Sequence, residues 1–257
     1  MKKINDIHFP YKYSICALVT NIEEYESMLK SFKQKGFNET NSEFLYIDNT
    51  ERNIFNAYSG LNHFLTNASG RYVILCHQDI ILEHDNEQNL GQCLSELDSM
   101  DKSWALAGNA GGVNLSELAI RITDPGGTSK IGTFPSKVVS LDENFIVVNQ
   151  KNRVCLSGDL EGYHLYGSDL CIIADILGFN NYVINFHLTH NSDSSSVKIP
   201  NSYYIDQQKL ILKYRRALRG RFIRTTCSRF FVSNSNFLSF LLNKKRILNI
   251  VRTLQIK

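Results

Sequence analysis

Apolar residues in the first third of the chain follow two alternating patterns. Nearly continuous apolar runs over 14–21, 43–50 and 71–79 each end in polar side chains. Between them, apolar residues recur every three or four positions over 25–32 and 54–68. Continuous short runs are typical of buried strands, and the wider spacing is typical of helices with one apolar face. The pattern therefore predicts strand, helix, strand, helix and strand in succession.

Local signals support these boundaries. Asn21 and Glu24 have the spacing of a capping box at the start of the first helix, and Gly36 is placed to end it. Gly70 marks a turn between the second helix and the third strand.

The middle of the chain continues the alternation with more irregular segments. A helix is predicted over 89–97 and another over 168–177, the latter ended by Gly178. The remaining segments are expected to be a strand running into a glycine turn over 104–112, an exposed loop over 123–136, a strand pair over 137–149 and a strand over 181–190.

Strands that alternate with helices indicate an α/β fold with a mostly parallel, Rossmann-like sheet covered by helices on both faces. Ligands of such sheets bind beyond the carboxyl ends of the strands. We therefore expect the polar strand ends to face one crevice; these are Thr20, Asn21, Asp48, Asn49, His77, Gln78 and Asp79.

Length and composition set the broad class of the protein. The 257 residues, 43% of them apolar, can form one large domain or two small ones. Apolar stretches are too short to cross a membrane, and the first residues lack the apolar centre of a signal peptide, so a cytoplasmic location is expected. The six cysteines form no CxxC pair, which argues against a zinc site or a disulfide framework and favours reduced, mostly buried thiols.

The small net charge of +3 hides a strong asymmetry. Residues 198–257 contain fourteen Lys or Arg and one acid, a charge of +13, which leaves −10 for residues 1–197. We therefore expect an acidic domain over 1–197 and a basic, helical C-terminal tail over 198–257. Basic residues interleaved with apolar ones favour binding to an anionic membrane surface. Packing against the acidic domain or another subunit, as in a homo-oligomer, and nucleic-acid binding are alternatives, although the domain contains no nucleic-acid module.

Three polar positions suggest chemistry at the predicted crevice. Asp79 and His190 end different strands, and a carboxylate and an imidazole so placed can share a divalent cation that binds a diphosphate. Asp169 begins a helix and is suited to act as a general base if it faces the same crevice.

Five ordered segments carry a family resemblance: "YIDNT", "FNAYSGLNHFLTNASGRYVILCHQDI", "LDENFIVV", "GYHLYGSDLCIIADILGFN" and "HLTHNS". Over residues 14–196 the chain resembles the family 2-like bacterial glycosyltransferases of the GT-A fold, and most closely the subgroup with HQD or HDD in place of DxD. The resemblance implies transfer of a sugar from a nucleotide-diphosphate sugar to a hydroxyl group, usually with inversion at the anomeric carbon.

The resemblance also implies roles for individual residues on the donor side. Asp79 matches the last acid of DxD and would bind Mg²⁺ or Mn²⁺ on the donor diphosphate, and His190 would complete the metal site. His77 replaces the first acid, which removes a negative charge near the diphosphate. The residues expected to contact the nucleotide sugar, for which a UDP-sugar is the expected donor, are Thr20, Asn21, Asp48, Asn53, Asn56, His77 and Gln78.

On the acceptor side, Asp169 in "YGSD" matches the catalytic base, with Ser168 where the family often has Glu. Residues expected near the acceptor are Asp142, Glu143, His164 and Tyr166, although Asp142 and Glu143 equally fit a solvated turn. The implied acceptor is a glycan or lipid-linked saccharide of bacterial lipopolysaccharide or capsule synthesis, at the inner face of the cell membrane. The alternative is a non-catalytic nucleotide-sugar-binding or scaffold protein of the same fold.

Overall fold

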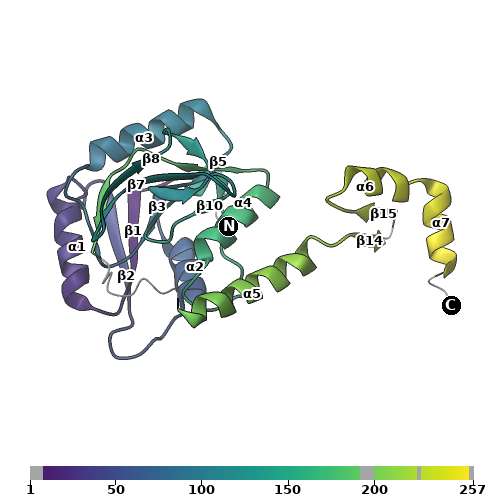
Figure 1. Cartoon of the computed structure of the whole chain (residues 1–257), viewed down its shortest axis with the longest axis horizontal. Coiled ribbons are helices and arrows are strands. Elements are labelled where there is room, and N and C mark those ends of the chain that lie inside the picture. The colour runs from purple at the N-terminus through teal and green to yellow at the C-terminus, as the bar shows by residue number, and fades with distance from the viewer. Residues whose placement is uncertain (1–7, 192–199, 225–226, 255–257) are drawn as a thin grey trace, which may run out of the picture. The chain divides into compact units, whose positions relative to one another are not determined.

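The computed structural model describes residues 8–191, 200–224 and 227–254 (Figure 1). The chain forms two compact units, Met1–Asp206 and Gln207–Lys257, and helix α5 (Asn201–Ala217) contributes to both. The predicted boundary at residue 197 falls among residues outside the described ranges and stays a prediction.

A seven-stranded mixed sheet forms the centre of the larger unit. Five strands run in one direction, and only β11 and β9 oppose them, so the prediction of a mostly parallel sheet is confirmed. In spatial order the strands are β2 (Ser42–Asp48), β1 (Tyr11–Val19), β3 (Gly70–Cys76), β11 (Phe145–Asn149), β5 (Trp104–Gly108), β12 (Asn180–Val183) and β9 (Ser136–Lys137).

Helices cover both faces of this sheet (Figure 1). On one face, α1 (Ile22–Gln34) and α3 (Glu87–Met100) bury Met28, Phe32 and three leucines against the strands. On the other face, α2 (Ala57–Asn67) and α4 (Tyr166–Ile176) bury a second apolar cluster. Because both faces are covered, consecutive strand residues are apolar, which is why the strands appear as continuous apolar runs.

The observed ends of the helices can be compared with the capping and stop residues predicted from the sequence. Asn21 is the N-cap of α1, accepting from the backbone N–H groups of Glu23 and Glu24, and Gly36 has a φ of 95° after the helix end. The expected start of α2 near Ile54 is wrong, because Asn56 caps this helix and Ile54 lies outside it, 57% exposed.

A second sheet crosses the carboxyl ends of the central strands. Its order is β10 (Ser140–Leu141), β6 (Ala110–Gly112), β7 (Leu118–Asp124), β13 (Leu188–His190) and β4 (Ile80–Ile81), with β8 (Gly127–Ile131) paired to β7. A 3₁₀ helix, η1 (Gln150–Asn152), follows β11.

This second sheet corrects three predictions. The expected loop over 123–136 contains the end of β7 and all of β8, which pair as a β-hairpin, and Gly127 at the start of β8 has a φ of 120°. The strand pair over 137–149 is split, because β10 and β11 belong to different sheets. The strand over 181–190 is likewise divided into β12 and β13.

The predicted glycine turn at 111–112 is also wrong, because both glycines lie in β6. A Cβ atom on Gly111 would lie 2.3 Å from the carbonyl oxygen of Ser140 in β10. The glycine therefore allows close pairing between β6 and β10, which carries the chain to Asp142 and Glu143.

The C-terminal unit is only partly helical, which corrects the prediction of a helical tail. A hairpin of β14 (Arg221–Arg224) and β15 (Arg229–Val232) separates α5 from α6 (Asn236–Leu242) and α7 (Lys245–Leu254). The hairpin strands are rich in Phe, Ile and Val, which favour extended structure. No helix among the described residues is long and apolar enough to cross a membrane.

The cysteines are free thiols, as expected, but only half are buried. Cys16, Cys76 and Cys171 are buried, Cys93 is partly buried, and Cys155 and Cys227 are exposed.

Candidate functional site

Two strands of the second sheet bring three polar side chains together. His77 follows β3, Asp79 immediately precedes β4, and His190 ends β13. In the antiparallel β4–β13 pair, His190 lies opposite Ile80, and the N–H of Asn191 donates to the carbonyl oxygen of Asp79. Backbone pairing thus fixes His190 beside the His77–Asp79 segment, although 111 positions separate Asp79 from His190 in sequence.

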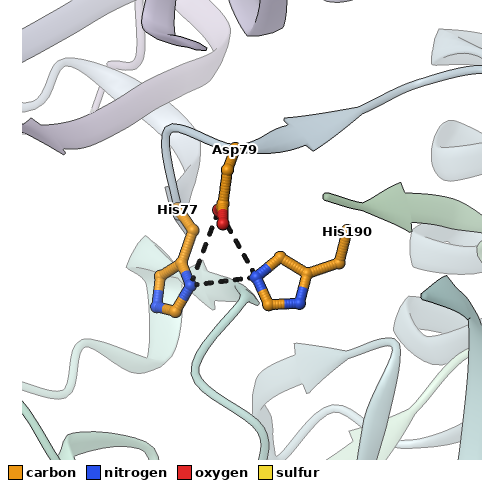
Figure 2. Close-up of side chains that lie close together, drawn as sticks. All are labelled: His77, Asp79 and His190. Atoms are coloured by element: carbon orange, nitrogen blue, oxygen red, sulfur yellow. Dashed lines mark hydrogen bonds and ion pairs between the residues drawn. The ribbon is translucent and has the colours of Figure 1, made fainter. Parts of the chain in front are cut away.

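The three side chains point toward one another (Figure 2). Asp79 Oδ1 lies 3.4 Å from His190 Nε2 and 3.9 Å from His77 Nδ1, and the two nitrogens lie 3.5 Å apart. Two ligand atoms bound to one cation at about 2.1 Å are separated by roughly 3.0 to 3.4 Å at right or tetrahedral angles. A small closure of this cluster, called here the triad, would therefore suit a single divalent cation.

Burial and mutual contact perturb the pKa of each triad member. Burial raises the pKa of Asp79, but the two imidazoles outweigh it and hold that pKa below its ordinary value. Burial lowers the pKa of His190, yet the Asp79 carboxylate more than compensates and the net pKa is raised. Burial, and then the neighbouring His190, lower the pKa of His77. At neutral pH His77 is therefore neutral and Asp79 is ionised.

Tyr166 determines which nitrogen of His77 faces the triad. Its hydroxyl donates to the backbone carbonyl of Glu143 at 2.9 Å and lies 3.0 Å from His77 Nε2. Burial raises the pKa of Tyr166 well above its ordinary value, so the hydroxyl keeps its proton. Because that proton is given to Glu143, His77 Nε2–H must be the donor to Tyr166. The lone pair of neutral His77 is then on Nδ1 and points into the triad.

Two hollows adjoin the triad and share His77 as a lining residue. The first, called the strand-end hollow, has a volume of about 270 Å³ and is lined by Thr20, Gln78, Asp79, Tyr163 and Tyr166 among others. The second, called the cross-sheet hollow, has a volume of about 480 Å³ and is lined by Asp142, Glu143, Ser168, His190 and Tyr203 among others. The triad thus stands where two ligand-sized spaces meet.

The predicted donor-side residues fall into two groups. Gln78 accepts hydrogen bonds from the N–H groups of Thr20 and Asn21, at 2.7 and 3.0 Å, and donates to Thr20 and Glu24. Its amide therefore holds the triad segment against the end of β1. Thr20, His77 and Gln78 line the strand-end hollow.

The other predicted donor-side residues do not line either hollow. Asp48 lies beside Val19 at the carboxyl ends of the parallel strands, where it is exposed and accepts hydrogen bonds from Thr50. Asn53 is exposed, and Asn56 caps α2. Asn49, also expected in the crevice, is buried and bonded to the backbone of residues 54–55.

The predicted acceptor-side residues are divided between the two hollows, since Tyr166 lines the strand-end hollow and the other three lie at or beside the cross-sheet hollow. Asp142 and Glu143 line it. The backbone N–H of Gly167, in the first turn of α4, donates to Glu143 Oε1 at 3.3 Å. Burial is the main cause that raises the pKa of Glu143 to about 8. His164 lies beside the hollow, with its Nε2 3.1 Å from the Ser202 hydroxyl.

Asp169, the expected general base, is fully buried and lines neither hollow. Its two carboxylate oxygens accept hydrogen bonds from the N–H and the hydroxyl of Ser157, at 2.8 and 2.7 Å. The position at the start of α4 was predicted correctly, but the side chain turns toward the 157 segment. The cross-sheet hollow is lined by Glu143 and Ser168 instead.

Sequence reasoning missed two aromatic residues at the hollows. Tyr163 lines the strand-end hollow, and its hydroxyl donates to the carbonyl oxygen of Phe55. Tyr203, in the first turn of α5, lines the cross-sheet hollow and lies near the ring of His164. The sequence offered one indication that Tyr163 belongs to the site, its position between Gly162 and His164. Tyr203 was missed because it lies in the segment that was interpreted as part of a basic tail.

Comparison with solved structures shows the fold. S. aureus TarS 1–349 in complex with UDP-GlcNAc superposes with a TM-score of 0.53 and 13% identity over 79% of this chain and 66% of that one. Mannosyltransferase PcManGT from Pyrobaculum calidifontis, in complex with GDP-Man and Mn²⁺, has a TM-score of 0.51 and 11% identity over 85% and 68%. GalNAc-T7 with UDP, GalNAc and Mn²⁺ has a TM-score of 0.55 and 8% identity over 79% and 48%.

These likenesses show a mixed α/β fold of the GT-A glycosyltransferase type. The chain spans 65% of the uncomplexed TarS 1–349 structure. No family model matches the sequence.

A curated protein of Fuscovulum blasticum named "ATP synthase subunits region ORF 6" is 34% identical over 224 residues, which cover 84% of this chain and 89% of that protein. That name states no activity. With this identity over most of both sequences, the chain belongs to the family of the F. blasticum ORF 6 protein.

Proposed function

We propose that this chain is a cation-dependent glycosyltransferase that moves a sugar from a nucleotide-diphosphate sugar to an acceptor hydroxyl. The observation that carries the proposal is the triad of His77, Asp79 and His190 at the junction of two hollows, on a GT-A-type fold. The similar structures of TarS and PcManGT hold UDP-GlcNAc, or GDP-Man with Mn²⁺. A UDP-sugar donor and a glycan or lipid-linked acceptor of bacterial surface polysaccharide are proposed from the sequence resemblance.

The triad fits a divalent cation in its chemistry as well as its spacing. Asp79 Oδ1 is buried and has no hydrogen-bond partner among the described residues, which is costly for an ionised oxygen unless another charge compensates. His77 Nδ1 presents a lone pair, and one carboxylate with two imidazoles suits Mn²⁺ better than Mg²⁺, which prefers oxygen ligands. A cation bound here would neutralise the charge of a departing nucleoside diphosphate.

The two hollows divide the substrates. The strand-end hollow, with Thr20, Gln78 and Tyr163 in its wall, would hold part of the nucleotide. The cross-sheet hollow would hold the transferred sugar and the acceptor, because it reaches Glu143 and His190. Asp48, Asn53 and Asn56 keep their proposed nucleotide contacts from the resemblance, at the same end of the sheet.

We assign the proton acceptor to Glu143. Its carboxyl group lines the cross-sheet hollow and has a pKa of about 8, raised chiefly by burial. A base is most effective when its pKa lies near the working pH. Glu143 would take the proton of the acceptor hydroxyl while the oxygen of that hydroxyl forms the new bond to the anomeric carbon. The bond between the anomeric carbon and the nucleoside diphosphate would break on the opposite face. The products are an inverted glycoside, a nucleoside diphosphate and protonated Glu143.

A ligand screen of the intact protein tests this function. Thermal unfolding is followed with UDP- and GDP-sugars, each with Mn²⁺ or with EDTA. A donor at about 100 times its Kd should raise Tm by roughly 5 to 10 °C, and only when Mn²⁺ is present. Stabilisation without release of nucleoside diphosphate on addition of acceptor saccharides would support the non-catalytic alternative. The absence of stabilisation by any nucleotide would contradict both.

Tyr166→Phe tests the orientation of His77. Without the hydroxyl, His77 Nε2 loses the acceptor that keeps the Nδ1 lone pair in the triad, so the Kd for Mn²⁺ should rise about 10- to 100-fold. Titration calorimetry of the purified variant measures this. Tyr182→Phe is the matched control, because it removes a hydroxyl bonded to Asp101, outside the triad. Equal Mn²⁺ affinity in wild type and Tyr166→Phe would show that the hydroxyl does not orient the ligand.

A further inference from the structure

The C-terminal unit concentrates positive charge to an unusual degree. Residues 207–257 contain thirteen Lys or Arg and no Asp or Glu. The whole chain has a net charge of only +3, so the remainder carries −10. A cationic segment of this density attracts anionic surfaces over about a Debye length, roughly 10 Å at 0.1 M salt.

The same unit exposes large apolar side chains. On α6, Phe237 and Phe240 are 71% and 70% exposed and Leu238 is 41% exposed, and this helix buries no residue. On α7, Ile250 is 59% exposed. We define these four residues as the apolar face of the C-terminal unit. Burial of such groups in a nonaqueous environment is favourable, so four exposed large apolar side chains on two contacting helices indicate an interaction surface.

Specific hydrogen bonds hold α6 in place, so its exposure is a property of a folded unit. The Asn243 side chain accepts from the N–H of Phe231 in β15 and donates to the carbonyl oxygen of the same residue, at 2.8 and 2.9 Å. Ser235 caps the start of the helix. The ammonium group of Lys244 lies 4.8 Å from the ring centre of Phe240, which places a cation beside the apolar face.

Charge and side-chain type together select the partner. In a symmetric contact between two copies, the thirteen Lys and Arg residues of one C-terminal unit would face the thirteen of the other. Their mutual repulsion disfavours such a contact. Nucleic acid would satisfy the charge, and its bases stack on aromatic rings, but Leu238 and Ile250 offer no stacking face. An anionic membrane satisfies both features, because apolar side chains enter the acyl boundary while Lys and Arg meet the headgroups.

We propose that the C-terminal unit docks this protein on an anionic lipid surface through the apolar face, with Lys244 and Lys245 at its edge. The proposal is independent of the proposed glycosyltransferase activity. If the proposed function also holds, docking of this kind would keep the larger unit near acceptors that are attached to lipid.

Vesicle sedimentation of the full chain tests the proposal. Vesicles contain phosphatidylcholine alone or with about one third phosphatidylglycerol. Wild type should bind the anionic vesicles and leave the neutral ones largely unbound, and binding should weaken as salt is raised.

The double variant Lys244→Gln with Lys245→Gln should have a partition coefficient onto anionic vesicles about fivefold lower for each charge removed. Phe237→Ser with Phe240→Ser should lose tenfold or more. Ile54→Ser, which removes an exposed apolar residue of the larger unit, is the matched control and should bind like wild type.

A second measurement keeps the test independent of partial unfolding. Phe240→Trp places a reporter on the apolar face, and its emission should shift to the blue on addition of anionic vesicles, while buried Trp104 gives a constant background. The proposal would be overturned by equal binding to neutral and anionic vesicles, or by the absence of a shift in the emission of the reporter. It would also be overturned if RNA released the protein from vesicles and the Phe variants kept the RNA affinity of wild type. The last result would assign the unit to nucleic acid.

Discussion

Asp79→Asn and His190→Ala should each abolish Mn²⁺-dependent binding of the nucleotide-sugar donor and reduce turnover at least 1000-fold. Asp79 supplies the only carboxylate of the triad, and His190 supplies the ligand that strand pairing holds opposite it. Loss of either leaves two ligands, too few to hold a cation against water at micromolar concentration. Titration of Mn²⁺ and of donor into each variant, followed by release of nucleoside diphosphate, measures the effect.

Matched variants separate this effect from general damage to the fold. His63→Ala and Asp175→Asn remove one exposed imidazole and one exposed carboxylate on α2 and α4. Both should bind Mn²⁺ and donor as wild type does. The metal-free triad variants should stay folded and unfold about 2 to 4 °C below wild type, because each loses only the ion pair between Asp79 Oδ1 and His190 Nε2. Donor binding that survives in Asp79→Asn would refute the role of the triad.

Glu143→Gln should lower turnover by about 10²- to 10⁴-fold while the Kd values of Mn²⁺ and donor change by no more than a few fold. Glutamine keeps the size of the side chain and an oxygen that accepts from Gly167, but it cannot take a proton. Steady-state kinetics with saturating donor measures the loss. A turnover that is unchanged in Glu143→Gln would remove this residue from the reaction.

The raised pKa of Glu143 gives this prediction a second readout. The folded pKa of about 8 lies above the ordinary 4.5, so the folded state binds the proton more tightly than the unfolded state. The stability that this adds is complete below about pH 4.5 and is lost as pH rises to about 8. In EDTA, wild type should therefore lose stability relative to Glu143→Gln between about pH 5 and 8. The wild-type rate should rise over the upper part of this interval, as the carboxylate forms.

Asp169→Asn distinguishes the two candidate bases. The asparagine amide can keep both contacts to Ser157, accepting from its N–H and donating to its hydroxyl, so the fold should persist. The structure predicts turnover within about tenfold of wild type, whereas the family resemblance predicts a loss of several orders of magnitude. A large loss in folded Asp169→Asn, with normal turnover in Glu143→Gln, would return the role of base to Asp169.

The sequence predicted the N-terminal half of the fold well, because each element there carries its own signal. Both faces of β1 and β3 are buried, so their residues are apolar throughout, and Asn21 and Gly36 mark the ends of α1 by local hydrogen bonding and backbone conformation. The second sheet was missed because five of its six strands have only two to five residues. The pattern of β8 alternates little, and β10 consists of two residues whose partner, β6, was taken for a turn.

The candidate site was predicted in part for a similar reason. Strand ends indicated where Asp79 and His190 would lie, but only the pairing of β4 with β13 brings them together. His77 was expected near the diphosphate, and its inclusion in the triad depends on a side-chain direction that Tyr166 sets from a distant segment. The position of Asp169 on α4 was predicted, but its contact with Ser157 could not be inferred from spacing, and its role as a base stays a prediction.

The most direct test of the proposed cation site is the anomalous diffraction of crystals grown with Mn²⁺ and a nucleoside diphosphate. We expect one manganese peak within about 2.3 Å of Asp79 Oδ1, His77 Nδ1 and His190 Nε2, with the diphosphate on its open side. A nucleotide bound elsewhere, or a manganese ion held by other residues while the triad stays empty, would contradict it.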